Sequence, residues 1–167
     1  MQVEVIRAPE TLSSRPELAI AIDTLGKQSA VAQTLSREIT SAKLFETRQA
    51  AKQQQILFLA INDGKVLGYL KTGVKHLFYM SPTGEYSELD PICVLDFYVD
   101  EIWQRHGIGL QLFQYFLQKE RVSPAQLAYD RPSPLLFAFL NKHAGLTNYV
   151  LQPNRFVIFN EYFQFRQ

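Results

Sequence analysis

A glycine turn between an apolar run and a run with helical spacing sets the strongest limit on the fold and function of this chain. Residues 104–109 read Gln-Arg-His-Gly-Ile-Gly, after the apolar run 92–99 and before the helical run 110–120. Glycines let the backbone approach a ligand closely, because no Cβ is in the way. The unpaired N–H groups and the dipole at the start of a helix attract phosphate. Strand, turn and helix in this order therefore predict a pyrophosphate cradle, although a plain tight turn would give the same short pattern.

The same turn excludes two common phosphate-binding motifs. It has neither the Lys-Ser/Thr pair of a P-loop nor the third glycine of the dinucleotide fingerprint. It resembles Gln/Arg-x-x-Gly-x-Gly, the pattern with which GNAT acetyltransferases hold the pyrophosphate of acetyl-CoA.

The spacing of apolar residues predicts a mixed sheet with helices on both faces. The expected strands are 3–6, 56–61, a long one at 66–80 that bends near Gly73, 92–100, 127–130 and 155–159. The expected helices are one from Pro16 to about Leu35 with a serine cap, a short one at 41–51, and those at 105–121 and 134–143, the last capped by Ser133. A right-handed crossover through helix 105–121 would place strands 92–100 and 127–130 parallel to each other.

Bulk composition excludes several classes of protein. The 167 residues suit one domain, and we expect no boundary within 1–167. The net charge of +1 provides no overall field for nucleic acid. Cys93 is the only cysteine, so no intrachain disulfide can form. No run has the length of a membrane span or the form of a signal peptide. We expect an intracellular, monomeric protein that binds no nucleic acid.

Blocks around the glycine turn carry a more specific resemblance. They are Leu25–Lys27, Ala32–Ser36, Cys93–Tyr98, Gln104–Gly107, Leu112–Tyr115, Leu117–Val122, Asp130–Ser133, Phe139–His143 and Phe156–Phe159. With these blocks, the chain resembles the catalytic domain of the α-tubulin N-acetyltransferases, a divergent GNAT branch, from about residue 20 to 163. The resemblance implies an α/β, GNAT-type fold, with a mixed, mostly antiparallel sheet and a βαβ unit that binds acetyl-CoA.

The same resemblance implies a function. This is acetyl-CoA-dependent N-acetylation of a lysine side chain of α-tubulin in microtubules, by direct transfer in a ternary complex. Such an enzyme would be cytoplasmic and associated with the microtubule cytoskeleton. Two alternatives stay open: a GNAT enzyme for another protein or a small amine, and a non-catalytic module that binds tubulin or acetyl-CoA.

Acetyl transfer to an amine needs a group that removes a proton, because a free lysine has a pKa near ~10.4. Asp130 ends strand 127–130, and the resemblance implies that it is the essential carboxylate; a structural role in the turn would otherwise explain it. Cys93 begins strand 92–100, where the resemblance implies help in proton movement and the apolar alternation implies a core thiol. Gln33 is implied to bond near the reacting lysine, the alternative being an exposed helix glutamine.

Three charged residues are candidates for binding the acceptor. Asp96 interrupts an apolar strand, so it has either a local partner or a position at the cleft, and the resemblance puts it near the tubulin-binding groove. Lys71 and Lys75 are four apart on the expected strand 66–80, hence on one face. The resemblance implies that both lysines steer an acidic protein, whereas exposed strand lysines often only protect a sheet edge.

The candidate contacts for acetyl-CoA come from the glycine turn and from the resemblance. Lys142 could also simply complement the C-terminus of its helix. No metal site is expected. The full set of cofactor candidates is Phe97, Val99, Gln104, Arg105, His106, Gly107, Ile108, Gly109, Leu110, Ser133, Asn141 and Lys142.

Overall fold

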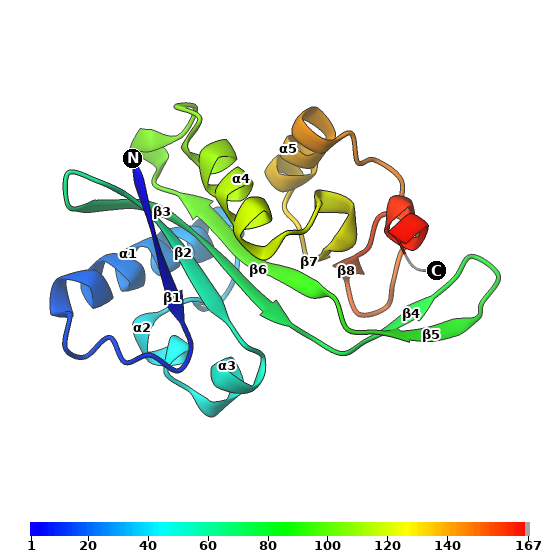
Figure 1. Cartoon of the computed structure of the whole chain (residues 1–167), viewed down its shortest axis with the longest axis horizontal. Helices are drawn as coiled ribbons and strands as arrows, with labels where there is room; N and C mark the ends of the chain where they lie inside the picture. The colour runs from blue at the N-terminus through cyan, green and yellow to red at the C-terminus, as the bar shows by residue number, and fades with distance from the viewer. Residues whose placement is uncertain (166–167) are drawn as a thin grey trace.

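The chain folds around a six-stranded sheet, seen in a computed structural model that describes residues 1–165 (Figure 1). The strand order is β1-β2-β3-β6-β7-β8, and every neighbouring pair is antiparallel except β6 and β7. This confirms the predicted mixed sheet and the parallel crossover. The strands are β1 (Gln2–Arg7), β2 (Ile56–Asn62), β3 (Lys65–Val74), β6 (Ile92–Val99), β7 (Ala128–Asp130) and β8 (Phe156–Val157).

Helices cover both faces of the sheet. α4 (Ile108–Glu120) and α5 (Pro134–Ala144) lie on one face, and α1 (Pro16–Ala32) lies on the other (Figure 1). The alternation in β2 explains both layers. Phe58 packs edge-on against Phe116 of α4, with ring centroids 5.3 Å apart, while its neighbour Leu57 packs into the cluster that α1 covers. No helix within residues 1–165 is both long and apolar enough to cross a membrane.

Two expectations about the first helices are wrong. Arg15, not a serine, precedes α1 and makes no side-chain cap; its guanidinium bonds the carboxylate of Glu4 instead. The segment expected as one helix, 41–51, forms the two short helices α2 (Ala42–Phe45) and α3 (Arg48–Lys52). Each begins after its own cap, because the Ser41 hydroxyl accepts from the N–H of Leu44 and the Thr47 hydroxyl from that of Ala50.

The long strand expected at 66–80 is also wrong. β3 ends at Val74, and β4 (Leu77–Met80) leaves the main sheet to form a hairpin with β5 (Tyr86–Leu89). The hairpin has its own apolar support, since Leu77 and Leu89 pack in a cluster with Phe156. Strand-forming residues on both sides of Lys75 and His76 therefore concealed a change of sheet.

Near the C-terminus, the predictions are closer. The Ser133 hydroxyl caps α5 by accepting from the N–H of Leu136, as expected. The expected strand 155–159 is shorter, with Phe156–Val157 in the sheet and Phe159 in an isolated bridge to Tyr149.

Candidate active site

β6 and β7 separate near the middle of the sheet. β7 pairs with β6 only through Cys93↔Ala128 and Val94↔Tyr129. β6 continues to Val99, paired there with β3 on its other side. Ligands bind open α/β sheets where the carboxyl ends of neighbouring strands diverge. Asp130 ends β7 at this place, and the glycine turn follows β6 at the same end of the sheet (Figure 1).

The turn into α4 has the geometry of an anion site. Gly107 is the residue before the helix, with φ at 77°, and no atom lies within 4 Å of where a Cβ would stand. The N–H of Gln111 bonds the carbonyl of Gly107, so the N–H groups of 108–110 lack a helical acceptor. The helix therefore starts later than the expected 105. These open amides fit a diphosphate.

The side chain of Gln104 makes a hydrogen bond within the protein. Its Nε2 donates to the carbonyl oxygen of Val99 at 2.7 Å, which ties the turn back to the end of β6. Arg105 and His106 are exposed beside it, and Arg105 is in the left-handed region at φ 68°. The side chain of Gln104 thus shapes the turn, and the exposed neighbours remain free to reach a ligand.

An aromatic cluster fixes α4, α5 and β6 relative to one another. The Phe139 ring centroid lies 5.6 Å from that of Phe97 and 5.5 Å from that of Phe113. Gly109 packs next to Phe97, since a Cβ there would stand 3.6 Å from the ring. Two cofactor candidates lie on α5: Asn141 and Lys142, which are exposed in the C-terminal half of that helix. The cofactor candidates therefore lie on three packed elements.

Asp130 is a half-buried carboxylate among cations. Its side chain is 24% exposed, and Arg131 Nε lies 4.0 Å from its Oδ1. Burial raises the pKa of Asp130, while the charges of Lys75, Arg131 and Lys71 act in the opposite direction. A carboxylate whose pKa is raised takes up a proton more readily in a reaction.

Asp96 has local partners, which resolves the two alternatives left by the sequence. It is 4% exposed, and its Oδ1 accepts from Ser29 Oγ at 2.9 Å and from Gln33 Nε2 at 3.1 Å. Its Oδ2 accepts from Thr40 Oγ1 at 2.6 Å and from Tyr69 Oη at 2.5 Å. The prediction that Asp96 contacts the acceptor is wrong for a carboxylate so enclosed. Gln33 belongs to the same network.

Gly26 lets the loop that carries Thr40 reach this network. A Cβ on Gly26 would stand only 1.9 Å from the Thr40 carbonyl oxygen, so the helix and the loop touch through backbone atoms. The backbone contact therefore brings the Thr40 hydroxyl to Asp96.

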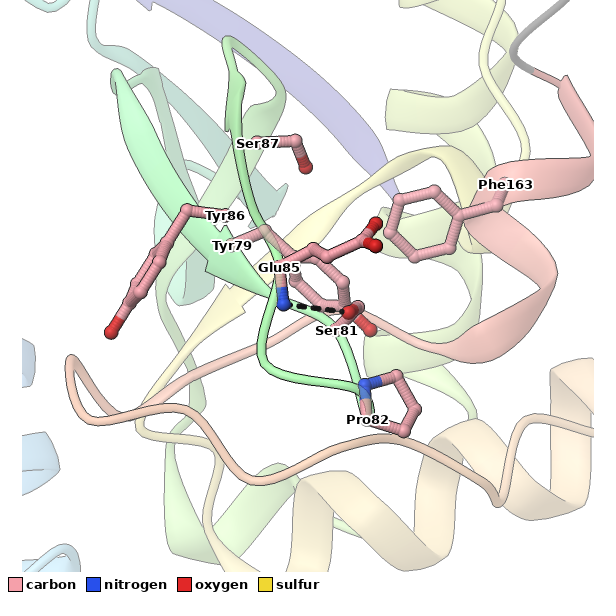
Figure 2. Close-up of a pocket in the computed structure, with 7 residues that line it drawn as sticks. All are labelled: Tyr79, Ser81, Pro82, Glu85, Tyr86, Ser87 and Phe163. Atoms are coloured by element: carbon pink, nitrogen blue, oxygen red, sulfur yellow. Dashed lines mark hydrogen bonds between the residues drawn. The ribbon is translucent and has the colours of Figure 1, made fainter.

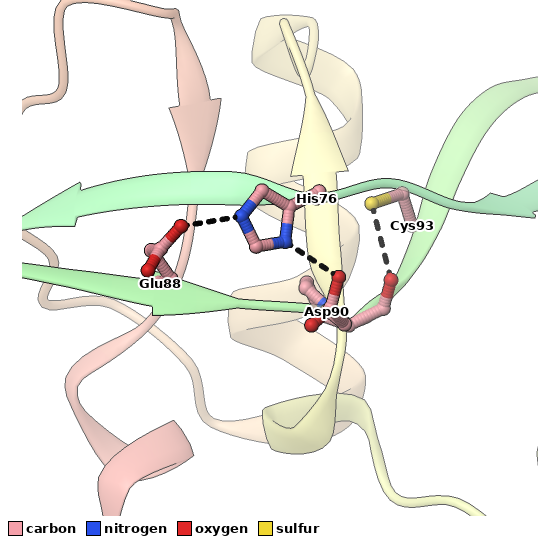
Figure 3. A network of polar contacts seen from close by, with 5 residues as sticks. His76, Glu88, Asp90 and Cys93 are labelled. Carbon is pink, nitrogen blue, oxygen red and sulfur yellow. Dashed lines mark hydrogen bonds and ion pairs between the residues drawn. The ribbon is translucent and has the colours of Figure 1, made fainter.

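Cys93 is a core thiol in this structure. It is fully buried, and its Sγ donates to the carbonyl of Pro91 at 3.5 Å (Figure 3). Burial raises the pKa of Cys93 to about 12. The group is therefore a neutral thiol near pH 7, not a thiolate.

The two lysines expected as an exposed pair differ. Lys71 is only 6% exposed, and its Nζ donates to the carbonyl of Ile39, so the prediction of a surface lysine is wrong there. Burial lowers the pKa of Lys71 to about 8. Lys75 follows the end of β3 and is half-buried, with its Nζ 5.3 Å from the ring centroid of Phe156. Of these two lysines, only Lys75 is exposed enough to contact a ligand.

Several polar groups were not found from the sequence. His76 bonds Asp90 through Nδ1 at 2.8 Å and Glu88 through Nε2 at 2.9 Å, which closes the base of the β4–β5 hairpin (Figure 3). These hydrogen bonds raise the pKa of His76. A cavity of about 250 Å³ lies at the hairpin turn, between the turn and Phe163 (Figure 2). The sequence did not indicate either feature, because β4 fell inside the expected strand 66–80 and no strand was expected at 86–89.

Comparison with known proteins gives a family. A family profile described as "GNAT acetyltransferase, Mec-17" matches residues 2–167. The "Alpha-tubulin N-acetyltransferase" of Phytophthora infestans is 66% identical over the full length of both chains. The protein of the same name from Tetrahymena thermophila is 42% identical over 95% of this chain, and "Alpha-tubulin N-acetyltransferase 1" of Danio rerio is 44% identical over 90%. The chain spans 38% and 51% of those last two relatives.

Solved structures match the fold. A predicted acetyltransferase of Clostridium acetobutylicum, solved with acetyl-CoA, has a TM-score of 0.58 at 10% identity and covers 92% of this chain and 96% of its own. The BH1408 protein of Bacillus halodurans, in a mutant form, reaches 0.59 at 14% identity, with 91% and 96% covered. These neighbours confirm the predicted GNAT-type fold.

Proposed function

This chain belongs to the Mec-17 family of GNAT acetyltransferases, and we propose that it transfers the acetyl group of acetyl-CoA to a lysine side chain of α-tubulin. The relatives that share most of its length carry that activity in their names. The observation that carries the proposal is that an open helix N-terminus at Gly107 and the half-buried carboxylate of Asp130 both follow the carboxyl ends of β6 and β7, where the two strands diverge.

In this proposal, acetyl-CoA lies in the gap between β6 and β7. The amides of 108–110 hold its diphosphate, and the free backbone edge of β6 at Phe97 and Val99 lies along its arm. Exposed side chains complete the site: Arg105 and His106 at the turn, and Asn141 and Lys142 on α5. Ser133 keeps a hydroxyl hydrogen to donate, since its oxygen serves the helix cap.

Asp130 is the proton acceptor of the proposed reaction. The acceptor lysine loses a proton to Asp130, directly or through water, and its nitrogen attacks the thioester carbon. The new C–N bond forms and the C–S bond breaks, and the departing CoA sulfur takes up the proton that the attacking nitrogen releases, so CoA leaves as a thiol. The half-buried position and raised pKa of Asp130 suit this role. Cys93 is fully buried and neutral, so it acts as core support rather than as a base.

Gln33 and Asp96 take a positioning role. The Nε2 of Gln33 is held by Asp96 and by Ser29 Oγ, so the amide is fixed at the end of α1. Lys75 is the cation that contacts the acceptor in this proposal, because Lys71, the other candidate, is buried. An enzyme with this acceptor works at microtubules, and we propose that association for the chain.

The test is a comparison of acceptors with the whole chain. Acetyl-CoA is supplied with polymerised tubulin or with a small lysine-like amine, and released CoA thiol is followed while mass spectrometry locates the acetyl group. We expect transfer to one α-tubulin lysine at a rate far above that on the small amine. Equal rates on both acceptors would point to a general amine acetyltransferase. Acetyl-CoA binding without transfer would overturn the enzyme and leave a binding module.

A further inference from the structure

A second cavity, of about 270 Å³, lies between α5, the segment that follows it, and the ends of β7 and β8. Its aromatic wall includes Phe137 and Tyr149, whose rings stack with centroids 5.4 Å apart, and Phe156. Its rim carries two arginines, Arg131 and Arg155. The cavity therefore combines an apolar wall with positive charge.

The two arginines are held side by side by the backbone. The N–H of Arg131 donates to the carbonyl oxygen of Arg155 at 3.2 Å, across the ends of β7 and β8. Both are in the left-handed region, at φ 43° and 64°, which non-glycine residues adopt at a cost of roughly 1–3 kcal/mol. Within residues 1–165, Arg155 has no carboxylate within 4.0 Å, and Arg131 reaches only Asp130 at that limit. Two cations thus share one rim with little anionic compensation.

The cavity adjoins the proposed catalytic carboxylate. Asp130 is the direct strand partner of Phe156, which lines the cavity. The Nζ of Lys75 lies over the Phe156 ring, 5.3 Å from its centroid. A polypeptide whose lysine reaches Asp130 therefore has Phe156 and the arginine rim beside it on the β8 side.

We propose that this cavity is a subsite for a carboxylate side chain that flanks the reactive lysine of the acceptor polypeptide. Guanidinium groups bind carboxylates in a bidentate, geometrically specific way, and the aromatic wall accommodates the carbon stem. The inference rests on the proposed function, because it needs a polypeptide lysine at Asp130.

Arg131 and Arg155 do not lie where the phosphates of the cofactor are proposed to bind. Phe139 faces the α4 side of α5, where the glycine turn opens, whereas Phe137 lines the cavity. Two positions apart on a helix are on opposite faces. The cavity is therefore separated from the cofactor gap by α5 itself.

The test compares lysine peptides that differ only by Asp or Asn at one position before or after the lysine. The ratio of kcat/KM for the Asp over the Asn peptide is measured in the unsubstituted chain and in Arg155→Gln. We expect a ratio of about ten in the former, equivalent to ~1.4 kcal/mol, and near one in the latter. Arg121→Gln is the matched control, because Arg121 is also exposed and left-handed, with φ 55°, but it ends α4 at the other end of the crossover. It should keep the full ratio.

Each outcome decides a separate point. An Asp preference that survives in Arg155→Gln, or that is absent from the unsubstituted chain, overturns the subsite while acetyl transfer continues. A raised KM for acetyl-CoA in Arg155→Gln, with the Asp preference intact, assigns the arginine to the cofactor and also overturns it. Failure of the unsubstituted chain to acetylate any lysine peptide or tubulin overturns the proposed function and the subsite with it.

Discussion

Asp96 and Asp130 are both carboxylates in apolar strands of one sheet, yet their surroundings are opposite. Asp96 lies in the middle of β6, is 4% exposed, and accepts four hydrogen bonds from groups on α1, β3 and the loop between α1 and α2. Asp130 ends β7, with 24% of its side chain exposed and positive charges around it. One carboxylate is enclosed by donors, and the other is partly open to solvent.

The difference separates a structural carboxylate from a reactive one. The donors of Asp96 join three elements and surround both of its oxygens, so this carboxylate holds the fold together and does not face a ligand. Asp130 has a raised pKa and access to solvent, so it can exchange a proton at small structural cost. A buried aspartate in a strand is therefore informative only once its donors are known.

The largest expected effect comes from removing the reactive carboxylate. Asp130→Asn keeps the shape of the side chain but cannot accept a proton, so we expect turnover to fall by about 10²–10⁴-fold with acetyl-CoA affinity unchanged. CoA release measures turnover, and calorimetry measures affinity. Asp63→Asn, in the exposed turn between β2 and β3, is the control and should keep full activity. Turnover by Asp130→Asn at the unsubstituted rate would remove Asp130 from the mechanism.

The structural carboxylate should show its effect on stability instead. Asp96→Ala leaves the hydroxyls of Ser29, Thr40 and Tyr69 without their acceptor in a buried place. We expect the free energy of unfolding to fall by about 3 kcal/mol, as measured by urea denaturation. Asp96→Asn keeps one oxygen acceptor and should lose less. A loss under ~1 kcal/mol in Asp96→Ala would mean that the network contributes little.

Local signals in the sequence predicted much of this fold. Strand 92–100, the glycine turn, the following helix and the parallel strand after it all depend on neighbours within a few residues. The same holds for the serine cap of α5 and for Gly145, which ends that helix at φ 65°. The place of Asp130 at the end of β7 follows from this unit, so the centre of the candidate site was accessible from sequence.

Contacts between residues far apart in the sequence could not be predicted from such local signals. Lys71 shares a face of β3 with Tyr69, and that face is covered by α1 and the loop that carries Ile39 and Thr40. Alternation along a strand shows which residues share a face but not what covers it. The donors of Asp96 are 27 to 67 residues away in sequence, which no local spacing reveals.

Lys71 connects the two aspartates and gives the smallest of these effects. The charges of Asp96 and Asp130 both favour its protonated form, but burial outweighs them and lowers its pKa to about 8 from 10.5. Between these values the unfolded chain binds more protons than the folded one, so stability rises with pH. From about pH 8 to about pH 9.5, the free energy of unfolding should increase by up to about 2 kcal/mol relative to Lys71→Met.

Urea denaturation at both pH values gives the free energy of unfolding of the unsubstituted chain and of Lys71→Met. The quantity to compare is the difference between these two free energies, because the buried tyrosines contribute equally to both. Lys65→Met, which removes an exposed lysine from the same strand, should follow the unsubstituted chain. If Lys71→Met shows the same pH dependence as the unsubstituted chain, Lys71 does not titrate in this range. Burial would then not outweigh the charges of Asp96 and Asp130 at Lys71.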